Sequence, residues 1–316
     1  MPDILVAGSL NTDLVVRTPY FPQPGETISG EDLKVIPGGK GANQAVAAAR
    51  HGAGVSMLGR VGKDNFGGFL LENLKSNRVD VQHVQLDDAS TGTAIIIVDS
   101  DGQNSIVISA GANGRVSEVD VESASFFGFK LLLLQLEIPI PTVLAAARRA
   151  RENGLQVILN PAPASELPGE LIALSDYLIP NETELSLLSG MDVNDTPATE
   201  RAAKSLLARG VRNVIVTLGR RGALIVTGTQ STHVDSFSVD VVDTTAAGDA
   251  FIGGFASSIL QNKTLEEAVR YGCACGALAV TKFGAQPSLP TKEAVENFLS
   301  HLHLHAGASV ASDPGE

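Results

Sequence analysis

The sequence has no tryptophan and only two cysteines, and its acidic residues outnumber its basic ones. With 23 Lys and Arg against 35 Asp and Glu, the formal net charge is −12. Binding to a nucleic-acid backbone requires a dense cationic surface, so this balance argues against a nucleic-acid partner. Cys273 and Cys275, two apart on a helix, would point about 200° from one another. We therefore expect buried, inert thiols rather than a disulfide or a metal pair.

No segment has the character of a membrane anchor or a targeting peptide. The longest apolar run, residues 131–136, is interrupted by Gln135 and is far shorter than the roughly 20 residues that a spanning helix needs. The first residues lack a basic region and are typical of a strand. We therefore expect a cytoplasmic protein with no membrane partner.

Several common catalytic signatures are missing as well. No Gly-x-Gly-x-x-Gly follows the first apolar run, which argues against a dinucleotide oxidoreductase. Residues 37–44 are rich in glycine but are no P-loop, because neither Ser nor Thr follows Lys40. None of the six histidines falls in a motif, which argues against a Ser-His-acid triad and a catalytic zinc. His301, His303 and His305 alternate near the C-terminus, where exposed histidines are commoner than a metal site.

The hydrophobic content, 44% of 316 residues, is ample for a large core. Short continuous apolar runs alternate with amphipathic stretches, which is typical of a parallel sheet covered by helices on both faces. We expect a doubly wound, mostly parallel α/β sheet. Its strands should lie near residues 4–8, 55–59, 130–136, 155–159, 176–179 and 212–217. Its helices should lie near residues 41–51, 65–76, 141–153, 181–189, 197–209, 247–261, 264–281 and 291–301.

Two segments depart from this α/β rhythm. Residues 14–36 contain two β-like pieces split by a Pro-rich turn, and residues 92–108 have the pattern of a hairpin. They could form a small separate sheet that serves as a lid or a dimer clasp, or they could extend the edge of the main sheet. We expect one α/β domain over residues 1–302 and a disordered tail over residues 303–316.

The most informative segment is residues 243–249, Asp-Thr-Thr-Ala-Ala-Gly-Asp, which precedes an apolar helical run. Small residues let the backbone approach a ligand closely. The start of a helix directs free N–H groups and the positive end of its dipole toward an anion. An acid in the first turn, such as Asp249, usually only stabilises the helix. Here, however, Asp249 follows the small residues Ala246, Ala247 and Gly248. This arrangement favours phosphoryl transfer to a hydroxyl, with Asp249 as the base.

Other polar residues could bind hydroxyl groups. Asn43, in the glycine-rich segment, offers both a donor and an acceptor, although a glycine turn capped by Asn is the alternative. Asn11 and Asp13 follow the first strand, and Glu137 follows the apolar run 131–136. The carboxyl ends of strands form the ligand crevice of open α/β sheets. A turn or a helix cap is the alternative for Asp13.

Three further segments could bind a nucleotide or a cation. Asn181 and Glu184 share one helix face, and the acid could hold Mg²⁺ through water or complete a capping box. Residues 217–222, Thr-Leu-Gly-Arg-Arg-Gly, could hold nucleotide phosphates or form a hairpin turn with exposed arginines. Residues 282–288 offer carbonyls and a hydroxyl to a hard cation, or only end a helix.

Taken together, these segments make the chain, over about residues 3–300, similar to the ribokinase (PfkB) family of carbohydrate kinases. The two family signatures correspond to residues 38–44, Gly-Gly-Lys-Gly-Ala-Asn-Gln, and to residues 243–249. The resemblance implies a ribokinase-like fold with a small β-sheet lid. It implies ATP-dependent phosphorylation of D-ribose at the 5-hydroxyl, Mg²⁺ dependence, K⁺ activation and a homodimer joined through the lid strands. Deoxyribose, fructose or a nucleoside are the alternative substrates, and a non-catalytic sugar-binding regulator would be expected to lack Asp249 or Gly248.

The resemblance also implies a role for each matching residue. Asp249 would be the base, and the backbone amides of Ala246, Ala247 and Gly248 would form an anion hole. The sugar would be bound by Asn11, Asp13, Gly39, Lys40, Gly41, Asn43, Glu137 and Asp249. ATP would contact Asn181, Thr217, Gly219, Arg220, Gly222, Gly248 and Cys273, where Cys273 replaces an expected His or Asn. Glu184 would organise Mg²⁺ through water, and K⁺ would be held by Asp243, Thr245, Ala279, Lys282, Gly284 and Ser288.

Overall fold

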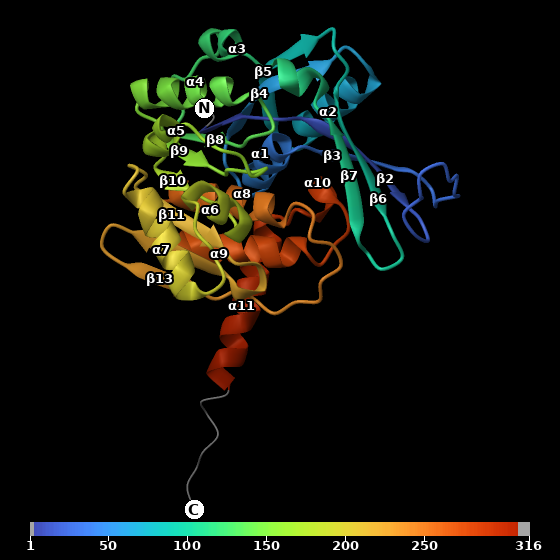
Figure 1. Cartoon of the computed structure of the whole chain (residues 1–316). Coiled ribbons are helices and arrows are strands. Elements are labelled where there is room, and N and C mark those ends of the chain that lie inside the picture. Colours follow the sequence, from blue (N-terminus) through green and yellow to red (C-terminus); the bar gives the residue numbers. More distant parts are fainter. Residues whose placement is uncertain (1–2, 309–316) are drawn as a thin grey trace, which may run out of the picture.

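The computed structural model describes residues 3–308 and contains one large sheet and one small sheet (Figure 1). The large sheet is built from β1 (Ile4–Ala7), β4 (Val55–Gly62), β5 (Val79–Asp87), β8 (Leu131–Leu134), β9 (Gln156–Leu159), β10 (Tyr177–Leu178), β11 (Asn213–Thr217), β12 (Ala223–Thr227) and β13 (Ser231–Val234). Their order is β13-β12-β11-β10-β9-β8-β1-β4-β5. All neighbours are parallel except β11–β12 and β12–β13, so the predicted mostly parallel sheet is confirmed.

Each face of the large sheet has its own hydrophobic core, because successive side chains of a strand point to opposite faces. Ile4 and Val6 belong to one core, whereas Leu5 and Ala7 belong to the other. The first core includes side chains from α1 (Lys40–Arg50), α2 (Asn65–Ser76), α8 (Ala247–Leu260), α9 (Leu265–Ala279) and α11 (Lys292–Ala308). The second includes side chains from α3 (Glu118–Ser123), α4 (Ile140–Glu152), α5 (Gly169–Leu174), α6 (Glu182–Ser189) and α7 (Thr196–Leu207). Helices on both faces make this the expected doubly wound fold.

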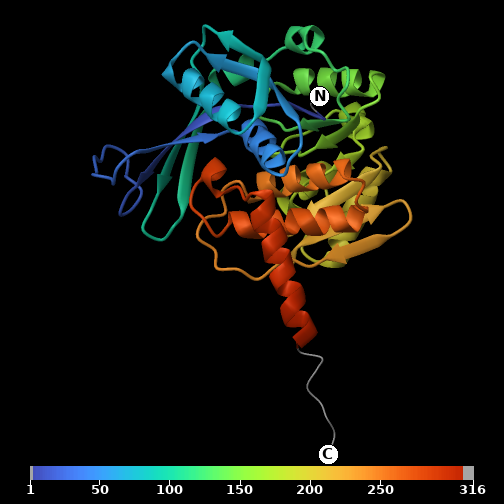
Figure 2. The ribbon, with the colours of Figure 1, turned by 180° about the vertical axis from the view of Figure 1, so that it is seen from behind.

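The two segments that departed from the α/β rhythm form a separate four-stranded sheet. Its strands are β2 (Asn11–Arg17), β3 (Lys34–Gly38), β6 (Gly92–Val98) and β7 (Asn104–Ser109), in the order β3-β2-β6-β7. The sheet extends away from the body of the molecule in both views (Figures 1 and 2). The prediction of a small separate sheet is therefore confirmed, and the alternative of an extension of the main sheet is wrong. We call these four strands the lid.

The direction in which strands are added to the main sheet reverses at β1. From β1 the chain continues to β4 and β5 on one side, and later from β8 through β9, β10 and β11 on the other. Such a switch point opens a crevice at the carboxyl ends of the two central strands, where open α/β sheets bind ligands. The segments that follow β1 and β8 are therefore the place to look for a site.

Some elements differ from the sequence prediction. The edge strand β5 and the short helices α3 and α5 were not predicted. Helix α11 continues to Ala308, into the segment expected to be disordered, and residues 309–316 lie outside the described residues. Within residues 3–308, no helix combines the length and apolar character that crossing a bilayer requires.

Candidate functional site

The glycine-rich segment packs directly against the chain that leaves β1. Gly39 precedes α1 with φ of 86°, a left-handed conformation that favours glycine. A Cβ added to Gly39 would lie 2.6 Å from the amide nitrogen of Asn11, and one on Gly41 would lie 2.6 Å from that of Ser9. Only glycine allows this close approach, which brings the start of α1 to the carboxyl end of β1. The segment is therefore more than a flexible turn.

Glu137, which follows β8, holds the start of α1 in place. Its Oε2 accepts hydrogen bonds from Ser9 Oγ at 2.5 Å and from the backbone amide of Lys40 at 3.0 Å. Glu137 is half-buried, and its other oxygen has no hydrogen bond among the described residues. The predicted sugar ligands Gly39, Lys40, Gly41 and Glu137 thus lie together at the switch point. Ser9, which connects them, was not predicted as part of the site.

Asn11 and Asp13 lie on the lid strand β2, so the alternative of a turn or a helix cap for Asp13 is wrong. Their backbone pairs with Gly38 and Ile36 of β3, and with Gly92 and Ala94 of β6. Polar residues can occupy this strand because ladder pairing on both sides satisfies their backbone groups. Both side chains are nearly buried at the base of the lid.

Asn113 fixes the point where the chain passes from the main sheet to the lid. It lies in the 3₁₀ turn η1 (Gly111–Arg115), and its Nδ2 donates to Asn11 Oδ1 at 2.7 Å. It also pairs with both backbone groups of Leu10, at 2.9 and 3.0 Å. Asn113 was not predicted as part of the site, and no motif in the sequence singles it out. Its contacts set the side chain of Asn11.

Asp249 lies in the first turn of α8 and is almost completely buried. Its Oδ2 accepts from Asn43 Nδ2 at 2.9 Å, and its Oδ1 accepts from Gln44 Nε2 at 3.0 Å. Burial raises the pKa of Asp249, while Lys40 and the amides of Asn43 and Gln44 lower it in part. The structure thus brings the two sequence signatures, residues 38–44 and 243–249, into direct contact.

The start of α8 is open to a ligand. Ala246 precedes the helix in a left-handed conformation with φ of 59°, and no side chain among the described residues caps the helix. A Cβ added to Gly248 would meet no atom within 4 Å. The amide of Ala247 makes a long contact of 3.3 Å with the carbonyl of Thr244. A helix start with this geometry is suited to an anion.

The charges of several acids act on one half-buried lysine between these elements. Burial alone lowers the pKa of Lys40, but the charges of Asp249, Glu137 and Glu184 raise it above its ordinary value. Burial, followed by the charges of Glu137 and Asp249, raises the pKa of Asp13 to about 7. The site therefore concentrates negative charge around one cation, and perturbed carboxyl groups of this kind are typical of functional sites.

Asn181 and Glu184 form a reciprocal capping box at the start of α6. Asn181 Oδ1 accepts from the amide of Glu184, and Glu184 Oε2 accepts from the amide of Asn181, each at 2.8 Å. The alternative of a capping box is therefore confirmed for Asn181 and Glu184. One carboxylate oxygen of Glu184 takes no part in this capping box. Burial raises the pKa of Glu184, with Asn181 and Lys40 opposing. The charge of Glu184 therefore acts on the same lysine as that of Asp249.

The segment 217–222 lies beside Asn181. Thr217 forms a β-bridge with Asn181, and Gly219 to Arg221 make a single 3₁₀ turn, η2, before the antiparallel strand β12. The alternative of a hairpin turn is therefore confirmed for the backbone of residues 217–222. Arg221 pairs with Glu182 at 2.5 Å, and Arg220 is exposed. The predicted nucleotide residues of both segments thus form one surface.

Cys273 and Cys275 are both free and buried on α9. Burial raises the pKa of Cys273 to about 12 and raises that of Cys275 as well. The prediction that both cysteines are buried and form no disulfide is therefore confirmed. Cys273 can offer a packing surface to a nucleotide base but only a weak hydrogen-bond donor.

Asp243 ties together the two segments that were predicted to hold a monovalent cation. Its Oδ1 accepts from the amide and the hydroxyl of Thr245 at 2.9 and 2.6 Å, and its Oδ2 accepts from the amide of Gly284 at 2.9 Å. The backbone of Asp243 also donates to the carbonyl of Val280 at 3.2 Å. Ser288 lies in the short helix α10 (Ala285–Ser288), where its hydroxyl donates to the carbonyl of Ala285 at 2.8 Å. The Asp243 carboxylate thus joins Thr245 to Gly284, and a carboxylate oxygen is a ligand suited to a hard cation.

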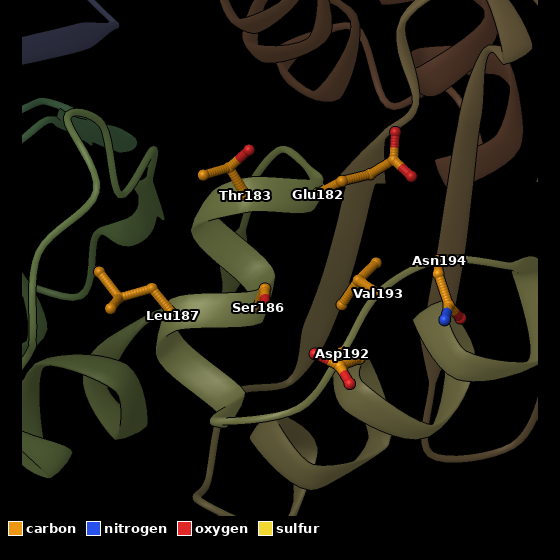
Figure 3. A pocket seen from close by; sticks show the side chains of 7 residues that line it. All are labelled: Glu182, Thr183, Ser186, Leu187, Asp192, Val193 and Asn194. Atoms are coloured by element: carbon orange, nitrogen blue, oxygen red, sulfur yellow. The ribbon is translucent and has the colours of Figure 1, made fainter.

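The predicted site is not the surface pocket shown in Figure 3. That pocket, of about 550 Å³, lies between α6 and the segment that follows it. It is lined by Glu182, Thr183, Ser186, Leu187, Asp192, Val193 and Asn194. None of the predicted sugar, nucleotide or cation ligands lines it.

Known proteins that are similar to this chain in sequence and in fold include several sugar kinases. The pfkB family of carbohydrate kinases matches residues 1–292. The ribokinase of Haemophilus influenzae is 42% identical over 301 residues, covering 94% of this chain and 98% of that protein. The deoxyribokinase of Salmonella typhi is 41% identical over 302 residues, covering 94% and 99%. The structure of Arabidopsis thaliana ribokinase complexed with ribose and ATP aligns with a TM-score of 0.86 and 35% identity, covering 94% and 98% of the two chains. The chain therefore belongs to the pfkB family of carbohydrate kinases, in which a phosphoryl group is transferred to a sugar hydroxyl.

Proposed function

We propose that the chain transfers the γ-phosphoryl group of ATP to the 5-hydroxyl of D-ribose, giving ribose 5-phosphate and ADP. One observation carries the proposal: a buried carboxylate, Asp249, lies at an uncapped helix start and is held by two side-chain amides of the glycine-rich segment. A base beside an anion cradle is what phosphoryl transfer to a hydroxyl requires. Ribokinases and a deoxyribokinase with about 40% identity support a pentose as the substrate.

Asp249 accepts the proton of the attacking hydroxyl in this proposal. Its carboxylate is held as an acceptor, because both of its oxygens receive hydrogen bonds from amides. Bonds of this kind favour the charged form and oppose the effect of burial on the pKa of Asp249. A buried base at this position can receive a proton from a hydroxyl without competition from bulk water.

The sugar is bound at the base of the lid. Asn11 and Asp13 approach from β2, Gly39, Lys40, Gly41 and Asn43 from the start of α1, and Glu137 from the end of β8. Asn43 Oδ1 and one oxygen of Glu137 have no hydrogen bond among the described residues, so both can accept from hydroxyls. Alternating acceptors and donors of this kind match the hydroxyls of a small sugar.

The transferred phosphoryl group faces the start of α8. The amides of Ala246, Ala247 and Gly248 stabilise its charge, and the open space at Gly248 leaves room for it. Each well-placed donor of this type typically contributes ~3 kcal/mol to a transition state. Lys40 supplies a positive charge within the same group of side chains.

The nucleotide occupies the neighbouring surface. We assign its contacts to Asn181, Thr217, Gly219, Arg220, Gly222, Gly248 and Cys273, of which Asn181 and Thr217 are joined by a β-bridge. Glu184 would hold Mg²⁺ through water with the oxygen that the capping box leaves free. When bound, Mg²⁺ neutralises charge on the phosphate oxygens of ATP.

A monovalent cation such as K⁺ would order the anion cradle rather than contact phosphate. Its ligands would be Asp243, Thr245, Ala279, Lys282, Gly284 and Ser288, with Lys282 acting through its carbonyl because its side chain has no acceptor. Asp243 already joins Thr245, next to Ala246, to Gly284. A cation here would therefore act on the backbone of residues 246–248.

We also propose a cytoplasmic homodimer, with the lid as its clasp. All six residues of β7 are exposed, among them Ile106, Val107 and Ile108, which are at least half exposed. Exposed apolar side chains on an unpaired edge strand favour association with a second copy. A cytoplasmic location agrees with the dependence on ATP.

A coupled assay of ADP formation tests the substrate. Purified protein is offered D-ribose, 2-deoxy-D-ribose, D-fructose and adenosine in separate reactions with MgATP and KCl. We expect the largest kcat/KM with D-ribose. A larger value with 2-deoxyribose would reassign the substrate within the family, and turnover of none of the four would refute the proposed function.

A further inference from the structure

A chain of buried amide side chains crosses the carboxyl ends of three central strands and ends at Asp249. Gln44 and Gln135 have no exposed surface. Gln135 Nε2 donates to Gln44 Oε1 at 2.6 Å, and Gln44 Nε2 donates to Asp249 Oδ1 at 3.0 Å. Gln44 Nε2 also contacts Asn160 Oδ1 at 3.2 Å. Gln135, Asn160 and Ile179 directly follow β8, β9 and β10.

The orientation of each amide in this chain is fixed from the far end. The carbonyl of Ile179 can only accept, so Asn160 must present its NH₂ group to it, at 3.0 Å. The Oδ1 atom of Asn160 is then directed at Gln44, so Gln44 must donate a hydrogen bond to it from its own NH₂ group. Gln135 reinforces this by donating to the Gln44 oxygen. The side of Gln44 that meets Asp249 is therefore a donor.

Asn43 alone cannot hold the Asp249 carboxylate in one orientation. It also donates to Asp249, but its Oδ1 is buried and has no hydrogen-bond partner among the described residues, so a bound sugar could compete for its orientation. Gln44 is saturated by protein groups on both ends of its amide. Its amide therefore needs no partner from a bound sugar.

We infer that Gln44 is a positioning residue for Asp249, held in a single amide orientation by Gln135 and Asn160. Gln44 aims one carboxylate oxygen of Asp249 and keeps that carboxylate in its charged form, so that the second oxygen can receive the hydroxyl proton. The inference rests on the proposed function, since it assigns Asp249 the role of base.

Other charges also act on Asp249 and must be held constant in a test. Lys40 favours its charged form, whereas Glu137 disfavours it. Asp13 and Glu184 lie close enough to be perturbed by Asp249 in turn. A variant that removes the Gln44 donor without touching any of these groups isolates the contribution of the amide.

Gln44→Met removes the donor while keeping the length and volume of the side chain, and it is compared with the wild type by pH profiles of kcat and kcat/KM for D-ribose. We expect kcat at the optimum to fall about tenfold through loss of positioning, with KM for ribose changed less than about threefold. The acid limb of both pH profiles should move to a pH about 1 unit higher. This is the shift in pKa that is expected when a charged group loses one hydrogen bond. Gln135→Met, which leaves Asp249 untouched, should move the limb in the same direction by a smaller amount.

Thr142→Val is the matched control. Thr142 is also buried and donates to the carbonyl of Val116 at 2.9 Å, on α4 in the second core. Losing this bond should lower Tm without moving the pH profile. A Gln44→Met or Gln135→Met profile that coincides with the wild type would overturn the inference, even if both variants are less stable. If the wild type itself phosphorylates no pentose, the proposed function fails instead, so the two failures are distinguishable.

Discussion

Replacing Asp13 by asparagine should stabilise the ligand-free protein while weakening its affinity for sugar. In the folded chain the pKa of Asp13 is raised from 3.8 to about 7, first by burial and then by the charges of Glu137 and Asp249. A carboxyl group whose pKa is raised in the folded state makes the folded protein less stable as pH rises from 3.8 through 7. The reason is that the carboxyl group of the unfolded chain loses its proton at a lower pH than that of the folded chain. Asparagine carries no such charge at any pH.

The magnitude follows from the shift in pKa. One pKa unit corresponds to about 1.4 kcal/mol, so the raised pKa of Asp13 lowers the free energy of unfolding by about 1.6 kcal/mol at pH 5 and by about 4 kcal/mol at pH 8. A chain of 316 residues has an unfolding entropy of about 0.7 kcal/mol/K. The advantage of Asp13→Asn over the wild type should therefore grow by about 4 °C in Tm between pH 5 and pH 8.

Thermal unfolding at the two pH values, without ligand, measures this difference. Asp64→Asn is a control of opposite sign, because Asp64 caps α2 and accepts from Gly67 and Thr91. Burial raises the pKa of Asp64, but these hydrogen bonds outweigh it and the pKa is lowered. Asp64→Asn should be destabilised by the same amount at pH 5 and pH 8. A Tm advantage of Asp13→Asn that does not grow with pH would show that the pKa of Asp13 is not raised in the folded protein.

The remaining predictions concern the cation, the lid and the glycine-rich segment. Activity should be lower in Tris-only buffer than with KCl, and Asp243→Ala should abolish the response to K⁺; equal rates in both buffers would contradict an ordering role for the cation. Val107→Asp, on the exposed face of β7, should shift a dimer toward monomer in analytical ultracentrifugation, and an unchanged sedimentation coefficient would argue against the lid as a clasp. Gly41→Ala places a Cβ 2.6 Å from the amide of Ser9, so it should cost about 1–3 kcal/mol, or roughly 2–4 °C in Tm, and raise KM for ribose.

The layers of the fold could be predicted because the central strands are continuously apolar. Residues 131–134 are buried on both faces, and such runs indicate a parallel sheet with helices on each side. β5 was missed because it is an edge strand in which polar and apolar residues mix along Val79–Asp87. The helices α3 and α5 have six residues each, too few for a helical period to show.

The site could be predicted only where several functional residue types lie close together in the sequence. Residues 38–44 and 243–249 combine glycines, amides and carboxylates within one turn, so they stand out in the sequence. Ser9, Asn113 and Gln135 are single polar residues in ordinary surroundings, and their importance comes from partners about 30 to 130 positions away. The position of Asn11 and Asp13 on a strand depends on pairing with β3 and β6, which no local pattern reveals.

The role of Asp249 as the base is tested most directly by Asp249→Asn, which keeps the size of the side chain and removes its capacity to accept a proton. The measurement is the single-turnover rate of phosphoryl transfer from ATP to D-ribose, with the ribose Kd of the same preparation determined by calorimetry. We expect a rate at least ~10² lower, with a Kd that stays within about threefold of the wild-type value. An Asp249→Asn protein that transfers phosphate at the wild-type rate, or that loses ribose binding instead of transfer, would contradict this role of Asp249.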